Sequence, residues 1–549
     1  MNEVLPRPRT VLARRFVAAA VAVALTTTPL AQTALPAPAK QESPVSTPSG
    51  NLWNQLPAAQ EPFAIPRPSD SALRGPDVNG YRGSLLPDLG DSSQVAFSPA
   101  QERKVGEQII RQLRAQGGYM QDPEVNDYLN ELGHRLVNAG HDSKQDFEFF
   151  AVPDTTINAF ALPGGYIGIN TGLIVLAQTE SELASVLAHE ISHVTQRHMA
   201  RMIDNQKNSM LMTLAGLALA VLASRAGGSG NSSATVAAIQ GTQALAIQNQ
   251  LDFTRENEYE ADRIGFQRLV AAGFDPNGAA GLMGRLQRSA RFVEGNAPSY
   301  LRTHPITFER IAEAQARAQD LPYRQVADSL DFHLVRALLK SYQGDARATA
   351  ASFEDALRQR KYNNEIAERY GLVASLLRAK DIPRARTELA KLERMAPPHP
   401  MIEAMAGNVL MGAEEYDAAA KRFAAALQRY PNKMQLVYDY PEALLKAKRP
   451  AEAAAFAEAQ LTRFPNDGPL HQVAARAYAE QNMRLLEHQH QGEFYAWAGN
   501  LPLAITQFEL AAKAGDGNFY QVSVVEMRLR KLRAEQADLK KDAFGRSSG

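Results

Sequence analysis

The sequence of 549 residues contains no cysteine and only two tryptophans. Without cysteine the chain has no thiol nucleophile, no disulfide bond and no lipoprotein anchor, although the redox compartment stays open. An excess of either charge is also lacking, because 59 Lys and Arg residues balance 59 Asp and Glu residues. Proteins that bind nucleic acid usually carry a basic excess, so we expect no nucleic-acid partner.

Long hydrophobic runs are lacking as well. The ten-residue apolar run from Phe16 to Leu25 follows four arginines and is followed by small residues and Pro29. This order is typical of a secretory signal peptide, and the run is too short to span a bilayer comfortably. We therefore expect residues 1–34 to direct export from the cytoplasm. An uncleaved N-terminal anchor is the alternative.

The most apolar internal segment runs from Met210 to Ala223, fourteen residues with almost no polarity. This length is short for a transmembrane helix and fits a buried, re-entrant or interfacial one. Two interpretations stay open. Residues 210–223 belong either to a helix pair that supports the core or a lid, or to a helix that contacts substrate or the surface of a membrane.

What the chain does contain is a metal-binding pattern. The residues from His189 to His193 read His-Glu-Ile-Ser-His, and on a helix this spacing presents two imidazoles to one ion with a carboxylate beside it. A helix is predicted because Thr179 and Glu182 match a capping box and apolar residues follow at steps of three and four. The pattern predicts zinc-dependent peptide hydrolysis in which Glu190 takes the proton from the attacking water.

A catalytic zinc site needs a third protein ligand. The metzincin pattern requires glycine at position 196 and histidine at position 199, whereas this chain has Gln196 and Met199. That class is therefore excluded. His198 lies about 140° around the helix from His193, so we expect it outside the ligand set, either behind the ligands or on the surface.

A better third ligand lies downstream, where Glu258 and Asp262 stand one turn apart on a second predicted helix. Glu258 can bind the metal, and Asp262 can accept the free ring N–H of a ligating histidine and fix its orientation. Taken alone, the pair would fit a charged, solvated helix face. Together with His189 and His193, the pair predicts a complete metal site.

This combination of His-Glu-x-x-His with Glu-x-x-x-Asp resembles the M48 peptidases, a gluzincin family. Residues 158–165 and 171–173 also resemble the family's strand before the zinc helix. The resemblance implies an α+β metallopeptidase domain with a small sheet and one Zn²⁺ per chain. Strands are expected at Phe147–Val152 and Tyr166–Ile169, on either side of the turn at Gly164 and Gly165.

His304 follows the third ligand and precedes a helix expected to begin near Phe308. From a loop its ring can reach the open metal position, either as a fourth ligand that keeps the enzyme latent or as a donor to the tetrahedral oxyanion. A cap or loop hydrogen bond is the alternative. The Thr-His-Pro sequence around it resembles one found at this place in periplasmic M48 proteins.

The domain organisation follows from changes in composition. Residues 35–97 are rich in Pro, Ser and Gly and are predicted to be a linker or a draped segment. Ser98 is a predicted helix cap at the start of the metallopeptidase domain, residues 98–325. A second helix is expected over 123–138, and a repeat domain over 330–545.

The repeat domain is predicted from landmarks that recur every 34 residues, the tetratricopeptide period. Ala385, Ala419 and Ala453 keep this step, and so do Pro431 and Pro465. An extra helix is expected around 483–498, where the step is interrupted. Repeats of this kind form an α-α superhelix with a concave binding surface; a plain helical bundle is the alternative. The chain is therefore predicted to be mostly α.

His488 and His490 also lie in this region, two residues apart. Their side chains diverge by about 200° on a helix, so we expect surface residues rather than a second metal site.

An exported M48-like domain followed by such repeats resembles the periplasmic M48 peptidases of Gram-negative bacteria. The resemblance implies a periplasmic endopeptidase that binds and degrades misfolded or stalled outer-membrane β-barrel precursors, while the repeats dock substrate or the β-barrel assembly machinery. The alternative is a chaperone or assembly scaffold with little or latent proteolytic activity. The residues themselves support a zinc endopeptidase joined to a protein-binding superhelix.

Overall fold

The first described helix begins where the Ser98 cap predicts it. Ser98 accepts a hydrogen bond from the Gln101 backbone, and the Gln101 side chain accepts one from Ser98 N. The computed structural model describes residues 98–140, 145–205, 255–291, 299–322 and 325–544. The predicted signal peptide (1–34), the predicted linker (35–97) and the apolar segment 210–223 lie outside these ranges.

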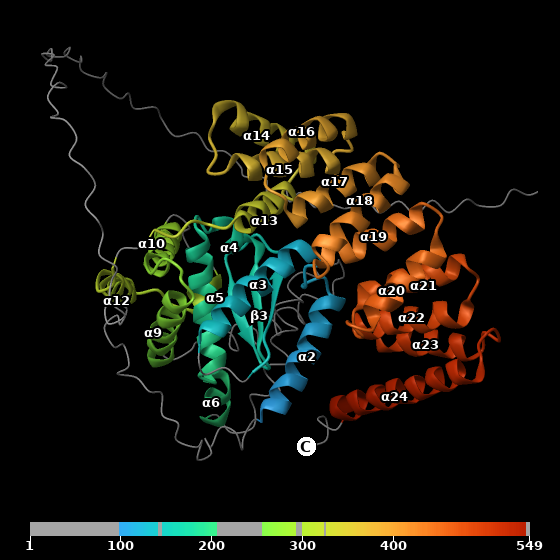
Figure 1. Ribbon diagram of the computed structural model, residues 1–549. Coiled ribbons are helices and arrows are strands. Elements are labelled where there is room, and N and C mark those ends of the chain that lie inside the picture. Colours follow the sequence, from blue (N-terminus) through green and yellow to red (C-terminus); the bar gives the residue numbers. More distant parts are fainter. Residues whose placement is uncertain (1–97, 141–144, 206–254, 292–298, 323–324, 545–549) are drawn as a thin grey trace, which may run out of the picture. The chain divides into compact units, whose positions relative to one another are not determined.

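The N-terminal part combines a small sheet with helices (Figure 1). Its elements are α2 (Pro99–Ala115), α3 (Pro123–Ala139), β1 (Glu148–Val152), β2 (Ala159–Leu162), β3 (Tyr166–Asn170), α4 (Thr171–Leu176), α5 (Glu180–Thr195), α6 (His198–Asn205), α9 (Arg255–Ala271), α10 (Asn277–Arg291), α11 (Ser299–Thr303) and α12 (Phe308–Gln319).

The sheet has the order β1-β3-β2, with β1 parallel and β2 antiparallel to β3. β3 is buried throughout, as expected for the central strand. Gly164 and Gly165 have φ values of +79° and +84° and join β2 to β3. The two expected strands are present as β1 and β3. The prediction that these two strands flank the glycine turn is wrong, because β2 lies between them in sequence and directly precedes the turn.

The C-terminal part is entirely helical within the described residues. Its helices are α13 (Leu330–Ser341), α14 (Ala346–Gln359), α15 (Glu365–Arg378), α16 (Ile382–Met395), α17 (Pro400–Gly412), α18 (Tyr416–Arg429), α19 (Met434–Lys446), α20 (Pro450–Leu461), α21 (Gly468–Glu480), α22 (Arg484–Trp497), α23 (Leu501–Ala512) and α24 (Phe519–Phe544).

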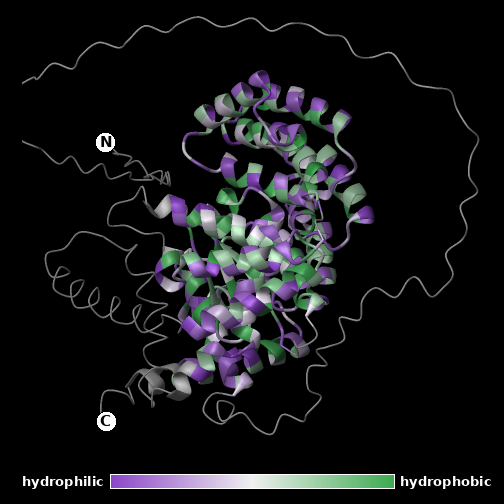
Figure 2. Cartoon of the chain, turned by 90° about the vertical axis from the view of Figure 1, so that its left-hand side faces the viewer, coloured by the Kyte–Doolittle hydropathy of each residue, from purple (hydrophilic) through white to green (hydrophobic). Residues whose placement is uncertain are grey.

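Successive helices of this part pack against one another in chain order, which is the organisation of helical repeats. The alanines that carry the 34-residue step are fully buried, and so is the bulky Phe423, four residues after Ala419. Hydrophobic and hydrophilic residues are interspersed along the helical ribbons seen in Figure 2. The expected extra helix is α22, and the prediction of a mostly α chain with tetratricopeptide-like repeats is confirmed.

His490 corrects one expectation for this part. It is 4% exposed rather than on the surface, and its Nδ1 lies 2.9 Å from Nδ1 of His471, which is also buried. Its Nε2 lies 2.9 Å from a Glu458 carboxylate oxygen. Angular spacing along one helix could not reveal this burial, because α21 covers that face of α22.

A hydrophobic core runs from the sheet into the first repeats. Phe149 of β1, Leu187 of α5 and Phe332 of α13 belong to one continuous cluster. Polar contacts accompany it: Glu180 at the start of α5 accepts hydrogen bonds from the backbone N–H and hydroxyl of Ser329, 3.1 and 2.6 Å away. The zinc helix predicted from sequence is therefore supported from the repeat side as well as from the sheet.

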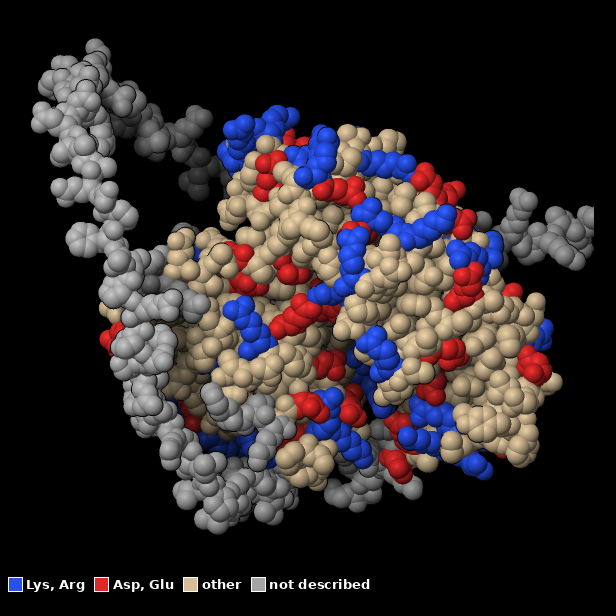
Figure 3. Space-filling model, in the orientation of Figure 1, with Lys and Arg blue, Asp and Glu red and all other residues tan. Residues whose placement is uncertain are grey.

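On the face seen in Figure 3, basic and acidic side chains lie interspersed among uncharged residues. This agrees with the balance of 59 cationic and 59 anionic side chains in the sequence. No helix among the described residues is long and apolar enough to cross a membrane.

Candidate metal centre

The helix α5 carries the His-Glu-x-x-His pattern inside the protein. Thr179 caps it by accepting a hydrogen bond from the Glu182 backbone, as predicted. In a complete capping box the Glu182 side chain would accept a hydrogen bond from Thr179 N, but here it accepts one from Gln178 N. His189, Glu190 and His193 are at most 5% exposed.

The helix α9 lies directly against α5 because Gly265 has no side chain at the contact. A Cβ at Gly265 would lie 3.1 Å from backbone atoms of Ala188 and His189, a distance tighter than an ordinary van der Waals contact. This close approach brings Glu258, on the first turn of α9, to the histidines of α5.

Four side chains converge at this point. Nε2 of His189 lies 3.0 Å from Nε2 of His193, and Glu258 oxygens lie 3.5 and 3.4 Å from these two atoms. His304, which directly follows α11, brings its Nδ1 to 2.9 Å from Glu258 and 3.4 Å from His189 Nε2. One ligand atom of each residue lies within 4.8 Å of all the others.

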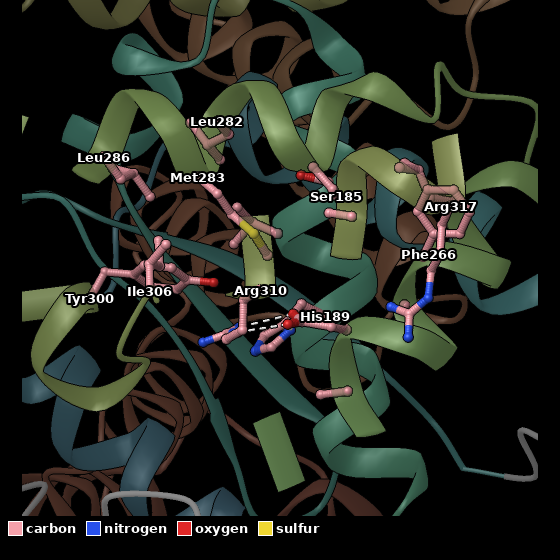
Figure 4. Close-up of a pocket in the computed structure, with 17 residues that line it drawn as sticks. Ser185, His189, Phe266, Leu282, Met283, Leu286, Tyr300, Ile306, Arg310 and Arg317 are labelled. Carbon is pink, nitrogen blue, oxygen red and sulfur yellow. Dashed lines mark hydrogen bonds and ion pairs between the residues drawn. The ribbon is translucent and has the colours of Figure 1, made fainter. Parts of the chain in front are cut away.

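Asp262 lies behind His189, one turn along α9 from Glu258. Its Oδ1 is 3.0 Å from His189 Nδ1, the ring nitrogen that faces away from the other ligands. Arg310 of α12 holds this carboxylate through Nε at 2.6 Å and a terminal nitrogen at 2.8 Å (Figure 4). Another terminal nitrogen of Arg310 lies 2.8 Å from Glu258 and donates to the Pro305 carbonyl at 2.7 Å.

Sequence reasoning missed the part played by Arg310. The residue follows His304 in the chain, but nothing in its local pattern points to the carboxylates of α9. Its guanidinium joins Glu258, Asp262 and the backbone beside His304, so one side chain fixes three parts of the centre.

His198 lies behind the other histidine of α5. It is fully buried, its Nδ1 is 2.8 Å from His193 Nδ1, and its Nε2 is 3.0 Å from Glu260. Arg201 of α6 contacts the same Glu260 oxygen at 2.8 Å. Of the two positions expected for His198, the one behind the ligands is therefore confirmed, and the surface position is wrong.

Glu190 projects into the centre with both carboxylate oxygens buried. Neither oxygen has a hydrogen-bond partner of ordinary geometry among the described residues, although Nε2 of His304 lies 3.5 Å away. Burial raises the pKa of Glu190. An unpaired buried carboxylate is costly in a folded protein, and its presence is typical of a group retained for chemistry.

The charges at the centre favour a bound cation. Burial opposes the ionisation of Glu258, but His304, His189 and His193 hold its pKa well below the usual value. Burial is likewise outweighed at Asp262, where Arg310 and His189 lower the pKa to about 2. At His189, burial is outweighed by hydrogen bonds to Asp262 and Glu258, which raise the pKa to about 10. Both carboxylates are therefore ionised at neutral pH.

Imidazole nitrogens and a carboxylate oxygen converging on one point form a donor set that suits a divalent transition metal. The carboxylate of Glu190, buried beside this set without a hydrogen bond of ordinary geometry among the described residues, fits the same interpretation. The residues present are therefore able to hold a metal ion.

A buried metal-ligand set on a His-Glu-x-x-His helix, beside a small sheet, defines a metallopeptidase. The family model for "Peptidase family M48" matches residues 123–318. The chain belongs to the M48 peptidase family and is a metalloendopeptidase.

Two relatives match most of the chain, and a third matches less than half of it. The "Beta-barrel assembly-enhancing protease" of Yersinia pestis is 33% identical over 422 residues, covering 77% of this chain and 86% of the relative. The protein of the same name from Escherichia coli K12 is 32% identical over 456 residues, covering 83% and 92%. The "Mitochondrial metalloendopeptidase OMA1" of Schizosaccharomyces pombe is 28% identical over 248 residues, covering 44% and 68%.

Proposed function

We propose that this protein is a zinc endopeptidase of the cell envelope that binds and degrades misfolded or stalled outer-membrane β-barrel precursors. The observation that carries the chemistry is the convergence of His189, His193 and Glu258 beside the buried carboxylate of Glu190. The names of the relatives in Yersinia pestis and Escherichia coli support the choice of substrate. Export to the periplasm rests on the N-terminal sequence pattern.

His189, His193 and Glu258 are the proposed protein ligands of one zinc ion per chain. When bound there, zinc polarises the scissile carbonyl and makes water more acidic. Asp262 accepts the Nδ1–H of His189, which leaves Nε2 free to bind the ion and fixes the angle of the ring. Arg310 keeps Asp262 in place through two hydrogen bonds.

Glu190 is the proposed general base. Its buried carboxylate takes the proton from the attacking water and later delivers it to the leaving amine. Burial raises its pKa, and a base whose pKa lies closer to the operating pH also returns its proton more readily. β2 runs beside α5 and, within the described residues, pairs with β3 along one side only, so it is an edge strand. Such a strand suits the binding of an extended substrate by main-chain hydrogen bonds.

His304 is the proposed fourth ligand of the latent enzyme. Its Nδ1 points into the ligand set, and its ring packs on Tyr300 with 4.8 Å between ring centroids. Displacement of His304 would open the coordination position that substrate and water need, and its Nε2, near Glu190, would then be available to the oxyanion. Replacing His304 with alanine therefore tests latency and turnover together.

The repeats are the proposed docking surface for substrate or for the assembly machinery. We take residues 98–325 as the peptidase domain and 330–545 as the repeat domain. Stacked helix pairs form extended concave surfaces that bind other proteins, and this supports a role in substrate capture.

The test compares wild type with Glu190→Gln on an unfolded outer-membrane β-barrel precursor, after the zinc content of both proteins has been measured. We expect one zinc per chain in both and cleavage by wild type alone. If wild type is no faster than Glu190→Gln, and His304→Ala does not release activity, the protein is a scaffold rather than a peptidase for these substrates.

A further inference from the structure

The last helices of the repeats expose several large hydrophobic side chains. Among the described residues, nine such side chains are exposed, and six of them lie between residues 483 and 527. The most exposed of the six are Phe519 (89%), Tyr520 (75%) and Met527 (60%), all on α24, the final helix of the repeats (Figure 1). A terminal repeat normally turns a polar face to solvent, so this exposure indicates a binding surface.

The exposed residues of α24 follow the geometry of the helix. Tyr520 and Met527 are seven residues apart, which places them on the same side. Val525 and Leu532, also seven residues apart, are buried on the other side in a cluster with residues of α23. α24 is therefore held to the repeats by one side, while an aromatic ring and a thioether project from the other.

The turn before α24 adds a residue of α22 to this surface. Asp516 in the turn accepts hydrogen bonds from the backbone N–H groups of Arg484 and Leu485, 2.6 and 3.0 Å away. The turn therefore lies against the start of α22. Met483, which is 41% exposed at that start, and Phe519, which follows the turn, stand at the same end of the repeats. We call Met483, Phe519, Tyr520 and Met527 the terminal surface.

The exposed charges around the terminal surface are mainly positive. The cationic side chains exposed there are Arg484, Lys513, Arg530 and Lys531. Arg533 is exposed as well but pairs with Glu509 at 2.6 Å. Asp516 is engaged by two backbone N–H groups, so Glu526 and Asp538 are the acidic side chains that oppose the four cations. The terminal surface therefore carries an excess of positive charge.

This combination fits an anionic bilayer better than another protein. In a two-fold contact between copies of the chain the surface would meet itself, so cations would face cations at a cost in free energy. The central anchor of a protein interface usually fills a close-packed pocket. A ring that is 89% exposed stands clear of the protein, which suits entry into the headgroup layer of a membrane.

We infer that the terminal surface docks this protein on anionic phospholipid. Phe519, Tyr520 and Met527 enter the headgroup region, and the surrounding cations attract the lipid phosphates. The helix α24 lies on the bilayer in this arrangement and does not cross it. The inference goes beyond the proposed function, because docking requires neither zinc nor cleavage.

The experiment measures co-sedimentation of the exported, purified protein with vesicles of phosphatidylcholine alone and with vesicles that also contain phosphatidylglycerol. Mass spectrometry confirms where the chain starts. We expect binding to the anionic vesicles that weakens with added salt. Phe519→Ser combined with Tyr520→Ser should weaken it about 10-fold. Arg530→Gln should weaken it about 5-fold, the contribution of one cation at a membrane surface.

The matched controls are Phe308→Ser in α12 and Arg347→Gln in α14, which change an exposed aromatic and an exposed cation elsewhere. Both should bind anionic vesicles as wild type does, and thermal melting checks the fold of every variant. Equal binding to both kinds of vesicle, or binding that survives the Phe519 and Tyr520 changes, would overturn the proposal.

A second copy of the chain is the other occupant that the experiment detects. If wild type binds neither vesicle but sediments as a dimer that Phe519→Ser separates, the terminal surface is an interface between copies and the proposal is wrong. Glu190→Gln should bind anionic vesicles as wild type does. Failure of the proposed peptidase function is therefore distinguishable from failure of membrane docking.

Discussion

Among the residues that the structure describes, buried histidines meet in two places, and the donor atoms converge as a metal site requires in one of them. In the peptidase part, ring nitrogens of His189, His193 and His304 converge on one point together with Glu258. In the repeats, His471 and His490 meet through their Nδ1 atoms, 2.9 Å apart.

The remaining nitrogens of the repeat pair point away from each other. Nε2 of His471 lies 3.1 Å from the Pro465 carbonyl, and Nε2 of His490 lies 2.9 Å from Glu458. Each histidine of this pair is therefore satisfied by protein hydrogen bonds and joins neighbouring repeat helices. The difference teaches that convergence of lone pairs, rather than the number of buried histidines, defines a metal site.

The largest effect should come from removing a ligand. His193→Ala should lose zinc and reduce cleavage by more than the loss of the base Glu190 does, whereas His490→Ala should keep one zinc per chain and its activity. Metal analysis after dialysis, together with cleavage assays, checks both variants. Zinc loss from His490→Ala would contradict the contrast between the two groups.

Removing the proposed base should come next. Glu190→Gln keeps the shape of the side chain but cannot take a proton, so we expect cleavage to fall by roughly 10²–10⁴-fold. Zinc content should stay at the wild-type level because Glu190 is not a ligand. A variant that loses zinc in parallel with activity would assign Glu190 to metal binding instead.

The residues behind the ligands should have a smaller effect on metal affinity. Asp262→Asn removes the anionic acceptor of His189 Nδ1–H, and such changes typically weaken metal binding by about 10–100-fold. Glu458→Gln makes the matching change behind His490 and should not alter zinc affinity. Competition with a fluorescent chelator measures both, and equal affinities in the two variants would argue against the role of Asp262.

Metal binding should also displace about one proton per chain near neutral pH. Without metal, Asp262 and Glu258 outweigh burial and raise the pKa of His189 to about 10, so the ring is protonated. A bound metal requires the neutral ring. Zinc titration by calorimetry in buffers of different ionisation enthalpy counts the released protons. A count near zero would show that His189 is neutral before zinc binds.

The smallest effect concerns the repeat pair and stability. Burial, followed by the neighbouring His490, lowers the pKa of His471 below its usual value. Between the native and unfolded pKa values the unfolded chain binds more protons, so this contribution to stability is present at neutral pH and is lost as the pH falls below about 6.5. His471→Gln should flatten the fall in melting temperature between about pH 7 and pH 5, and an unchanged slope would contradict the assignment.

Much of this structure is predictable because it is encoded locally. The Ser98 and Thr179 caps, the helix that bears His189, the one-turn spacing of Glu258 and Asp262, and the helical repeats all depend on residues close together in sequence. These features agree with the structure.

The remaining features depend on contacts between distant segments. Arg310 reaches carboxylates on another helix, His198 is buried by its contact with Glu260, and the pocket beside His189 (Figure 4) forms only where several elements meet. The burial of His490 has the same origin. Such contacts have no periodic signature in a single sequence.

The segment from Tyr300 to Arg310 carries a further consequence for inhibitors. If His304 is the fourth ligand, every chain holds an internal competitor at an effective concentration in the millimolar range, as short tethers typically produce. A chelating inhibitor can bind only molecules in which His304 is detached. The apparent affinity of the inhibitor is therefore its intrinsic affinity multiplied by the fraction of such molecules. Because the ring of Tyr300 packs on His304, a compound that detaches this histidine must also replace that ring contact.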